Sequence, residues 1–425
     1  NDSLPSLEKE AQEVAKLALG SVCRNLVALF QDSESVRRGT DSDPQGDWPK
    51  DKNLVILGAG VMGSGVATVA IEKGLKVRLR DISTEALDRG LQAIGKAIGN
   101  KRKKKRISEH QQADILSRLG YGTELAGVNL CGGILEAVVE RLDVKRSVLA
   151  DIAPQLPDDA IFATNTSALS VSHIQEGSPV ADRVVGLHFF NPVSKMQLVE
   201  VVSQDGTDEK VLERLMAFCG EISRLPVPVT DYPGFLVNRA LTPYLMEAMV
   251  LMEEGVDKEV IDKAAIDFGM PMGPVALADQ VGLDICLHVA ESLKSSLDKP
   301  MPEINDELRR KVDAGNTGKK SGKGFYDWSD GTPRPDTDKA GPDDLTDRLI
   351  LPMLDGCVEC LRKGVARNAD EVDGAMIFAT GFAPFRGGPM HYAETRGTEE
   401  IRKRLEELAE RHGNRFAPDP GWADL

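Results

Sequence analysis

The stretch that decides the fold is NLVILGAGVMGSGVATVAIEKG, residues 53–74. An apolar run of strand type leads into Gly58, Gly60 and Gly63 at G-x-G-x-x-G spacing, and helix-type sequence follows. In such a pattern the first glycine allows a tight turn, the second lets a pyrophosphate approach backbone N–H groups, and the third lets the helix lie close to the strand. The stretch therefore predicts a phosphate-binding turn at the N-terminus of a helix.

An acidic residue extends this pattern. The run KVRLR is followed directly by Asp81, 18 residues after Gly63. A carboxylate there can accept both hydroxyls of an adenosine ribose and repels a 2′-phosphate, so we expect NAD rather than NADP. Arg78 and Arg80 precede it and weaken that selectivity argument. A glycine-rich turn without a ligand is the alternative, and the order of strand, turn, helix, strand and acid argues against it.

Two kinds of sequence follow one another along the chain. Over residues 53–230, short β-branched runs alternate with helix-period stretches, which predicts a parallel sheet covered by helices. Beyond residue 231 the sequence becomes helical, and NRALTPYL has a counterpart in DRLILPML. We therefore expect an α/β Rossmann-like NAD-binding domain followed by an all-α domain built from two helical repeats, residues 231–330 and 341–425. Residues 1–52 read as amphipathic helix and then polar linker.

Composition excludes several classes of protein. The 67 acidic against 52 basic residues give a formal charge of −15, which argues against a nucleic-acid partner. No apolar run is long enough for a transmembrane segment. Six sparse cysteines fit a reducing compartment. Cys357 and Cys360 form a C-x-x-C in a helix-like stretch, for which we favour helix packing over redox or metal chemistry, and we expect no metal site.

Two polar residues interrupt apolar runs. His188 ends RVVGLH, where a strand would deliver its side chain to the carboxyl edge of the sheet. Glu200 lies within QLVEVV, where an unpaired carboxylate would be costly to bury. We expect the two to pair, with the carboxylate fixing the imidazole tautomer and raising its basicity. From these residues alone, a pair in the core and a catalytic pair are equally compatible with the pattern.

Longer motifs add a resemblance to a family. The pieces GAGVMGSG, ATNTSALSVS, GLHFFNPV, LVEVV, DYPGFLVNR, GMPMGP, ADQVGLD and GKGFYDW occur in the order and spacing of L-3-hydroxyacyl-CoA dehydrogenases, from residue 53 to about residue 397. The duplicated helical unit and the leading LEKEAQ helix resemble the dehydrogenase half of the multifunctional fatty-acid oxidation enzyme, α subunit type. Nothing in the chain resembles the catalytic part of the enoyl-CoA hydratase domain found there, so we interpret residues 1–52 as a remnant of the junction and the chain as a fragment.

This resemblance implies an activity and its residues. The expected reaction is the NAD-dependent oxidation of L-3-hydroxyacyl-CoA to 3-ketoacyl-CoA in β-oxidation. His188 would be the catalytic base and Glu200 its orienting carboxylate, while Ser167 and Asn238 would bind the substrate oxygen and position the acyl thioester. Positions expected to bind the cofactor are Gly58, Gly60, Met62, Gly63, Asp81, Val138, Val139, Glu140, Lys145, Asn165, Ser167 and Asn191. For Asn165, Ser167 and Asn191, turn chemistry after strands is the alternative.

A dense basic run stands out on this acidic chain. Lys103, Lys104 and Lys105 lie at its centre, residues 101–106, and the resemblance implies that they bind the phosphoadenosine of coenzyme A. A solvated helix face explains the run equally well. In the second repeat, Asp347 stands at the position of Asn238, so we expect that repeat to replace the partner subunit of dimeric relatives and the chain to be monomeric by itself.

Other assignments stay open at the level of sequence. The resemblance allows a thiolase subunit as partner in a full-length complex. Without an address signal we favour the bacterial cytoplasm, although a mitochondrial matrix or a peroxisome also fits. Two other functions are kept: a non-catalytic dinucleotide-binding protein, and a 3-hydroxy-acid dehydrogenase that does not use CoA. The basic run and GKGFYDW weigh against the last.

Overall fold

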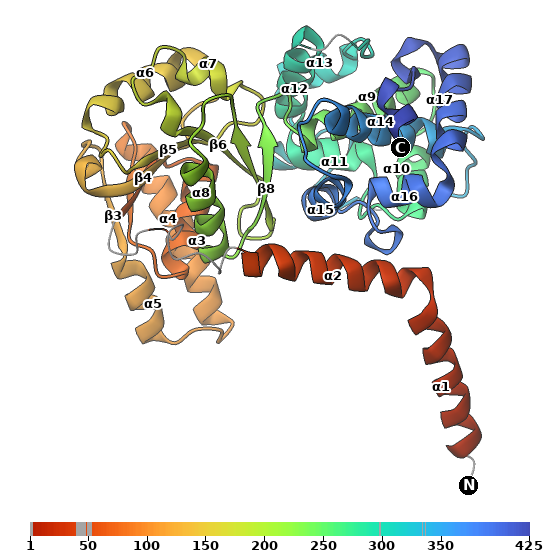
Figure 1. Cartoon of the computed structure of the whole chain (residues 1–425), viewed down its shortest axis with the longest axis horizontal. Helices are drawn as coiled ribbons and strands as arrows, with labels where there is room; N and C mark the ends of the chain where they lie inside the picture. The colour runs from red at the N-terminus through yellow and green to blue at the C-terminus, as the bar shows by residue number, and fades with distance from the viewer. Residues whose placement is uncertain (1–2, 40–47, 49–52, 297–298, 334, 336) are drawn as a thin grey trace. The chain divides into compact units, whose positions relative to one another are not determined.

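The computed structural model describes residues 3–39, 48, 53–296, 299–333, 335 and 337–425 (Figure 1). It divides into two compact units, residues 36–235 and residues 1–35 with 236–425.

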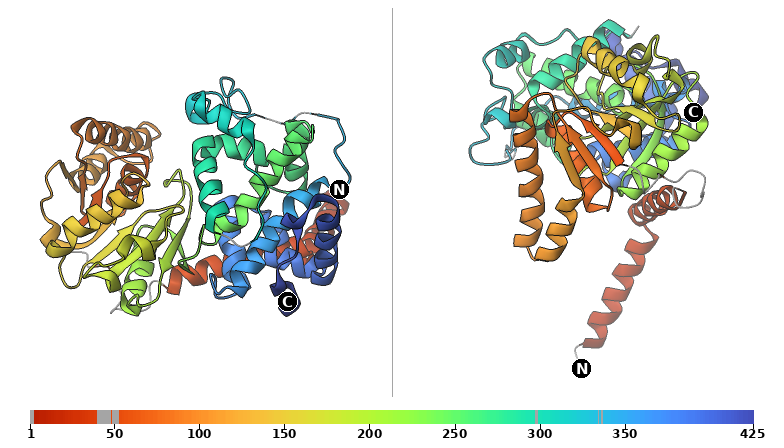
Figure 2. Two further views of the ribbon diagram at one scale, coloured as in Figure 1. Left: turned by 90° about the horizontal axis from the view of Figure 1, so that it is seen from above. Right: turned by 90° about the vertical axis from the view of Figure 1, so that its left-hand side faces the viewer.

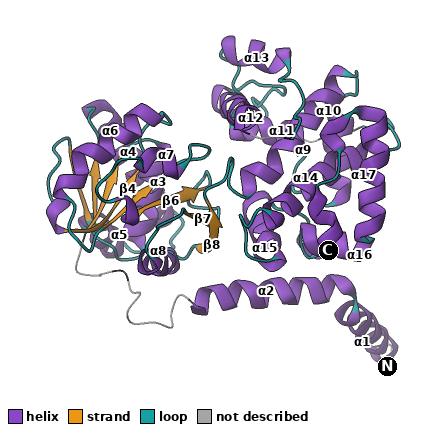
Figure 3. Ribbon diagram, turned by 45° about the horizontal axis from the view of Figure 1, so that its top comes forward, coloured by secondary structure: helices purple, strands orange, loops and turns teal. Residues whose placement is uncertain are grey.

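An eight-stranded sheet forms the centre of the first unit, with strand order β3-β2-β1-β4-β5-β6-β7-β8. Helices cover the strands, which are orange in Figure 3. The strands are β1 (Asn53–Leu57), β2 (Val77–Arg80), β3 (Leu119–Gly122), β4 (Cys131–Glu136), β5 (Ile161–Thr164), β6 (Val184–Phe189), β7 (Leu198–Ser203) and β8 (Leu225–Thr230). The helices are α3 (Val61–Glu72), α4 (Thr84–Lys103), α5 (Glu109–Ser117), α6 (Leu142–Ile152), α7 (Val171–Gln175) and α8 (Glu209–Glu221).

The direction of the strands departs from the sequence prediction at one junction. All pairs from β3 to β6 are parallel, as expected, but β7 runs antiparallel to β6. The next strand, β8, is parallel to β7. The prediction of a parallel sheet therefore holds for the other strand pairs and is wrong for the pair β6–β7. The short loop between β6 and β7 leaves no room for the crossover helix that parallel neighbours need.

The polar stretch before the sheet contains the end of a helix and a buried tryptophan, which its composition does not predict. Its first residues continue helix α2 (Ser21–Gly39), which follows α1 (Ser3–Leu19). Trp48 is 2% exposed, and its ring centroid lies 4.9 Å from that of Phe218 in α8. A Cβ added to Gly133 would lie 2.5 Å from the Trp48 ring, so the indole packs closely on β4. The rest of the interpreted linker, residues 40–47 and 49–52, lies outside the described residues.

The second unit is helical. Residues 236–425, green to blue in Figure 2, form one bundle. Two series of four helices correspond in order: α9 (Val237–Glu253), α10 (Lys258–Phe268), α11 (Pro274–Val281) and α12 (Leu283–Ser296), and then α14 (Leu345–Arg362), α15 (Ala369–Thr380), α16 (Pro389–Arg396) and α17 (Thr398–His412). Between them lies α13 (Asp306–Asp313). Pro243 lies inside α9 and Pro352 inside α14, so the sequence counterpart is also a structural one.

Buried ion pairs join the two repeats. Arg239 of α9 binds Glu359 of α14, and Arg348 of α14 binds Glu247 of α9, with 2.8 Å between Arg348 Nε and Glu247 Oε1. All four residues are at most 5% exposed. Because each repeat supplies one arginine and one glutamate, loss of either repeat would leave buried charges unpaired in the other.

Within the described residues, no helix is long and apolar enough to cross a membrane. No cluster of three His, Cys, Asp or Glu side chains suited to a metal ion occurs in the same residues. Cys357 and Cys360 are both fully buried in α14, and burial raises the pKa of the Cys357 thiol well above its ordinary value.

Candidate active site

The glycine turn has the backbone geometry that a dinucleotide needs. Gly58 has φ of +100°, and a Cβ there would lie 2.4 Å from the Ala137 carbonyl oxygen. A Cβ on Gly63 would lie 1.9 Å from the Gly58 oxygen, so α3 can start this close to the turn only with glycine. A Cβ on Gly60, in contrast, would meet open space.

The N-terminus of α3 is open to an anion. Gly60 is its N-cap, no side-chain cap binds the first N–H groups, and no acidic residue lies in the first turn. The first N–H groups of a helix and the positive end of its dipole attract an anion. The residues present therefore fit the pyrophosphate of a dinucleotide, with Gly60 on the open side.

Asp81 follows β2 beside this turn. Its two carboxylate oxygens accept hydrogen bonds from Ala59 N, at 2.8 Å, and from Ser83 N, at 3.0 Å. It is partly exposed, so further lone pairs are available to ribose hydroxyls. The neighbouring Arg80 donates its Nε–H to the Thr123 carbonyl, beyond β3. Because Arg80 is engaged with this carbonyl, the Asp81 carboxylate is the charged group that hydrogen-bonds the glycine turn.

His188 and Glu200 lie opposite each other across the antiparallel pair β6–β7. The distance between His188 Nδ1 and Glu200 Oε2 is 2.6 Å, and the side chains are 4% and 0% exposed. With the carboxylate accepting the Nδ1 proton, Nε2 carries the free lone pair. The imidazole is flanked by Phe190 and Phe235, whose ring centroids lie 4.4 and 5.8 Å away. The pairing expected from the two apolar runs is thus present as a hydrogen bond.

The loop after β5 carries two of the expected residues. Asn165 Oδ1 accepts the backbone N–H of Phe189, the residue after His188, at 3.2 Å. The backbone N–H of Ser167 donates to Glu140 Oε1 at 2.7 Å. Burial alone would raise the pKa of the Glu140 carboxyl. Lys145 and hydrogen bonds from Thr166 and Ser167 outweigh this effect and lower that pKa below its ordinary value. The loops after β4 and β5 are therefore joined through an ionised Glu140.

Lys145 was expected to bind the cofactor, and its side chain is fully buried. Its ammonium lies 2.8 and 3.1 Å from the two oxygens of Glu136 and 2.9 Å from the Asn165 carbonyl oxygen. In this arrangement it contacts protein acceptors. Glu136 was not predicted, although it lies in the apolar run ILEAVV and so carries the same sequence signal as Glu200.

The remaining expected residues lie on several elements. Met62 is in the first turn of α3, Val138 and Val139 follow β4, and Asn191 follows β6; Val139 and Asn191 are exposed. Asn238 is in the first turn of α9 and belongs to the helical unit. The basic run lies elsewhere, with exposed lysines at the C-terminal end of α4 and just beyond it: Lys103, Lys104 and Lys105.

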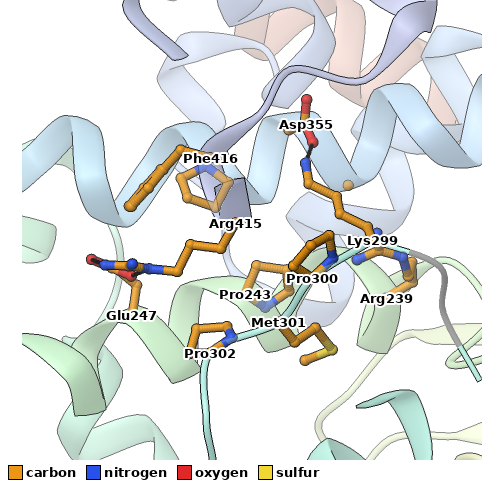
Figure 4. Close-up of a pocket in the computed structure, with 12 residues that line it drawn as sticks. Arg239, Pro243, Glu247, Lys299, Pro300, Met301, Pro302, Asp355, Arg415 and Phe416 are labelled. Carbon is orange, nitrogen blue, oxygen red and sulfur yellow. Dashed lines mark hydrogen bonds and ion pairs between the residues drawn. The ribbon is translucent and has the colours of Figure 1, made fainter. Parts of the chain in front are cut away.

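The helical unit contains a hollow of about 430 Å³, partly open to solvent (Figure 4). Its charged lining residues include Lys299, Asp355, Arg415 and Glu247. Lys299 binds Asp355, and Arg415 Nε lies 2.8 Å from Glu247 Oε2. Because these charges are already compensated, we do not assign the hollow as the active site.

Comparisons with known proteins identify the family of the chain. The family model "3-hydroxyacyl-CoA dehydrogenase, NAD binding domain" matches residues 53–232, and the model of the C-terminal domain of the same family matches residues 234–328. The chain is 34% identical, over 432 residues, to the fatty acid oxidation complex subunit alpha of Vibrio vulnificus. The match covers 98% of this chain and 60% of that protein, so the chain spans about 60% of the length of this relative.

Solved structures show the same likeness. The 3-hydroxybutyryl-CoA dehydrogenase of Escherichia coli K12 superimposes with a TM-score of 0.78 at 27% identity, over 88% of this chain and 98% of that one. The (S)-3-hydroxybutyryl-CoA dehydrogenase of Ralstonia eutropha has a TM-score of 0.62 at 34% identity, over 65% and 99%. These findings confirm the resemblance and the fold class expected from the sequence. The chain therefore belongs to the 3-hydroxyacyl-CoA dehydrogenase family and carries both the NAD-binding and the C-terminal domain of that family.

Proposed function

We propose that the chain catalyses the NAD-dependent oxidation of L-3-hydroxyacyl-CoA to 3-ketoacyl-CoA in fatty-acid β-oxidation. The observation that carries the proposal is the 2.6 Å hydrogen bond between His188 and Glu200. It leaves Nε2 of a nearly buried imidazole as the free base, in the same unit as the open glycine turn. A base of this kind is what removal of a hydroxyl proton requires.

The protein groups have separate tasks in this mechanism. His188 Nε2 takes the proton of the C3 hydroxyl, and Glu200 stabilises the imidazolium that forms. NAD held at the glycine turn would supply the acceptor for the C3 hydride. Ser167 and Asn238 hydrogen-bond the substrate oxygen and position the acyl thioester. Burial of the pair keeps water from competing for the base.

The cofactor is assigned to the carboxyl edge of the sheet. The N-terminus of α3 with Gly60 holds the pyrophosphate, and Asp81 accepts the adenosine ribose hydroxyls. The loops after β4 and β5, residues 138–140 and 165–167, would hold the nicotinamide half. These loops follow neighbouring parallel strands, where ligands bind in doubly wound folds.

The exposed lysines Lys103, Lys104 and Lys105 are assigned to the phosphates of coenzyme A. Lys101 and Arg102, in contrast, have carboxylate partners in Glu72, at 2.6 Å, and Glu109, at 3.6 Å. The phosphates of an anionic substrate would therefore bind the lysines at the centre of the basic run, residues 103–105.

The second repeat supports the first without forming a site of its own. Asp347, the counterpart of Asn238, lies 2.7 Å from Arg396 Nη1 and 2.8 Å from Arg404 Nε. Burial alone would raise the pKa of Asp347, but the two guanidinium groups outweigh this effect and lower that pKa. A carboxylate engaged in this way is unsuited to positioning an acyl thioester. We assign the repeat the place of a partner subunit, so that the chain is monomeric; an obligate dimer in light scattering would contradict this.

Two larger assignments follow from the likeness to the alpha subunit of a bacterial fatty acid oxidation complex. We propose that the chain acts together with a thiolase subunit and in the bacterial cytoplasm. Co-purification of the full-length protein with a thiolase would support the first assignment.

One assay separates the proposed function from its alternatives. NADH formation is compared for L-3-hydroxybutyryl-CoA and free 3-hydroxybutyrate, and we expect it only with the thioester. Equal rates would indicate a 3-hydroxy-acid dehydrogenase that does not use CoA. Absence of turnover with either, while NAD still binds, would indicate a non-catalytic dinucleotide-binding protein. A series of longer thioesters then defines the preferred acyl chain.

A further inference from the structure

The carboxylate of Glu136, the last residue of β4, accepts hydrogen bonds from three neighbours. Oε1 lies 2.8 Å from Val138 N and 2.8 Å from Lys145 Nζ, while Oε2 lies 3.1 Å from Lys145 Nζ and 2.6 Å from Thr164 Oγ1. The side chains of Glu136, Lys145 and Thr164 are all 0% exposed. A buried ion pair costs desolvation free energy, and additional hydrogen bonds to the charged groups offset this cost.

The position of Glu136 links the ends of two neighbouring strands. Its own side chain binds the N–H of Val138, two residues further along the loop after β4. It also binds Thr164, the last residue of β5. Lys145, held by Glu136, donates to the carbonyl of Asn165, the first residue after β5. The carboxylate thus fixes where both loops leave the sheet.

The same contacts continue toward the proposed reacting groups. Lys145 Nζ lies 3.4 Å from Glu140, and Glu140 accepts the backbone N–H of Ser167. Asn165 Oδ1 accepts the N–H of Phe189, the residue that follows His188. Two ion pairs of Lys145, with Glu136 and with Glu140, and further hydrogen bonds therefore connect Glu136 with the loop of Ser167 and with the end of β6.

We propose that Glu136 is a positioning residue for the nicotinamide half of NAD, acting through Val138 and Lys145 to hold the loops after β4 and β5 in their binding arrangement. The inference rests on the NAD site of the proposed function. Its physical basis is preorganisation: loops already fixed in the free protein lose less conformational entropy when the cofactor binds.

The test compares variants that separate charge compensation from positioning. Glu136→Gln keeps the shape and one acceptor but removes the charge. Glu136→Gln/Lys145→Met removes both buried charges, which restores stability where an ion pair serves only to compensate charge. Glu247→Gln in the helical unit is the matched control, because it breaks a buried glutamate–arginine pair that is distant in sequence from the sheet unit. NAD dissociation constants, without acyl substrate, and thermal unfolding are measured for each.

We expect Glu136→Gln to raise the Kd for NAD about tenfold or more, a change that corresponds to ~1.4 kcal/mol. The double variant should regain thermal stability and keep the weakened NAD binding. Glu247→Gln should lose stability and bind NAD like the parent. In turnover, the KM for NAD should rise while the KM for acyl-CoA stays unchanged.

Three results would overturn the inference: parental NAD affinity in Glu136→Gln, recovery of both stability and affinity in the double variant, or an equal loss of affinity in Glu247→Gln. If Glu136→Gln does not fold, Thr164→Val decides, because it removes one donor without changing charge. It should raise the NAD Kd by about threefold, the loss of one hydrogen bond, and an unchanged Kd would reject the proposal. If the parent itself does not bind NAD, the proposed function fails instead.

Discussion

Asp262 and Asp373 occupy corresponding positions in the two helical repeats, and each carboxylate caps the helix that follows. Asp262 accepts two N–H groups from the first turn of α11, at 2.7 and 3.0 Å. Asp373 accepts two from the first turn of α16, at 2.6 and 3.0 Å. Both helices begin with proline, which has no N–H, so the aspartates bind the first donors that exist. The duplication thus extends to individual hydrogen bonds.

Each cap also depends on a glycine before the proline. A Cβ on Gly273 would lie 2.2 Å from Asp262, and one on Gly388 would lie 2.4 Å from Asp373. No L side chain fits at that distance unless the aspartate moves away from the helix. The sequences GMPMGP and FRGGP are therefore explained by the approach of a buried carboxylate to a helix N-terminus.

The first prediction concerns the pH dependence of stability at Asp262. Burial, together with the charge of Asp279, raises the pKa of Asp262 to about 6 in spite of its hydrogen bonds. A raised pKa in the folded state means that the contribution to stability is fully present below the ordinary pKa, 3.8, and is lost as pH rises through 6. The unfolding free energy that Asp262 ceases to contribute is at most about 3 kcal/mol.

Urea unfolding of the parent and of Asp262→Asn between pH 4 and pH 7.5 measures this loss. The asparagine does not titrate, so the difference in unfolding free energy between the two proteins should shift in favour of the variant as pH rises from 4 to 7. A difference that stays constant over this range would mean that Asp262 keeps an ordinary pKa in the folded protein.

The second prediction concerns the catalytic base. His188→Gln should retain NAD binding and lose turnover with L-3-hydroxybutyryl-CoA by a factor of about 10² to 10⁴, the usual contribution of a general base. Glutamine can still donate to Glu200, which limits structural damage. NAD titration and steady-state kinetics on the same preparation separate the two effects. Parental turnover in this variant would refute the role of His188.

Much of the sheet unit could be predicted because its signals are local. The spacing of Gly58, Gly60 and Gly63 and the apolar runs around His188 and Glu200 each lie within a few residues. Strand β8 gave no such signal, since Pro226 and Pro228 interrupt LPVPVT and proline usually argues against a strand. The direction of β7 was also missed, because a buried apolar run reads the same in either direction.

Tertiary contacts explain the other differences. Trp48 is buried by α8 and β4, which are distant in sequence. The polar residues next to it in the sequence therefore gave no indication of its burial. Lys145 and Glu136 form their pair through the turn that joins β4 to α6. The sequence indicated a lysine near the cofactor, and only the packing of the sheet shows that its ammonium is enclosed by protein acceptors.

The third prediction concerns substrate binding by the basic run. Reversing the charges of Lys103, Lys104 and Lys105 to glutamate should raise the KM for acyl-CoA several-fold and leave the KM for NAD nearly unchanged. The expected increase is larger at low ionic strength, because exposed charges are screened by salt. The matched control reverses three exposed basic residues in the other unit, Lys9, Lys16 and Arg24, so that the change in net charge is the same. Equal effects on both KM values would indicate a general electrostatic effect.

The last prediction concerns cofactor choice at Asp81. Asp81→Asn keeps a side-chain oxygen that can accept from Ala59 N, so the glycine turn should persist. It removes the charge that opposes a 2′-phosphate, and the ratio of kcat/KM for NAD to that for NADP should fall by about tenfold or more, equivalent to ~1.4 kcal/mol. Arg80 is held by the Thr123 carbonyl in the parent, so the carboxylate should dominate selectivity. An unchanged ratio in the variant would instead assign the discrimination to groups other than Asp81, with the arginines Arg78 and Arg80 as the next residues to substitute.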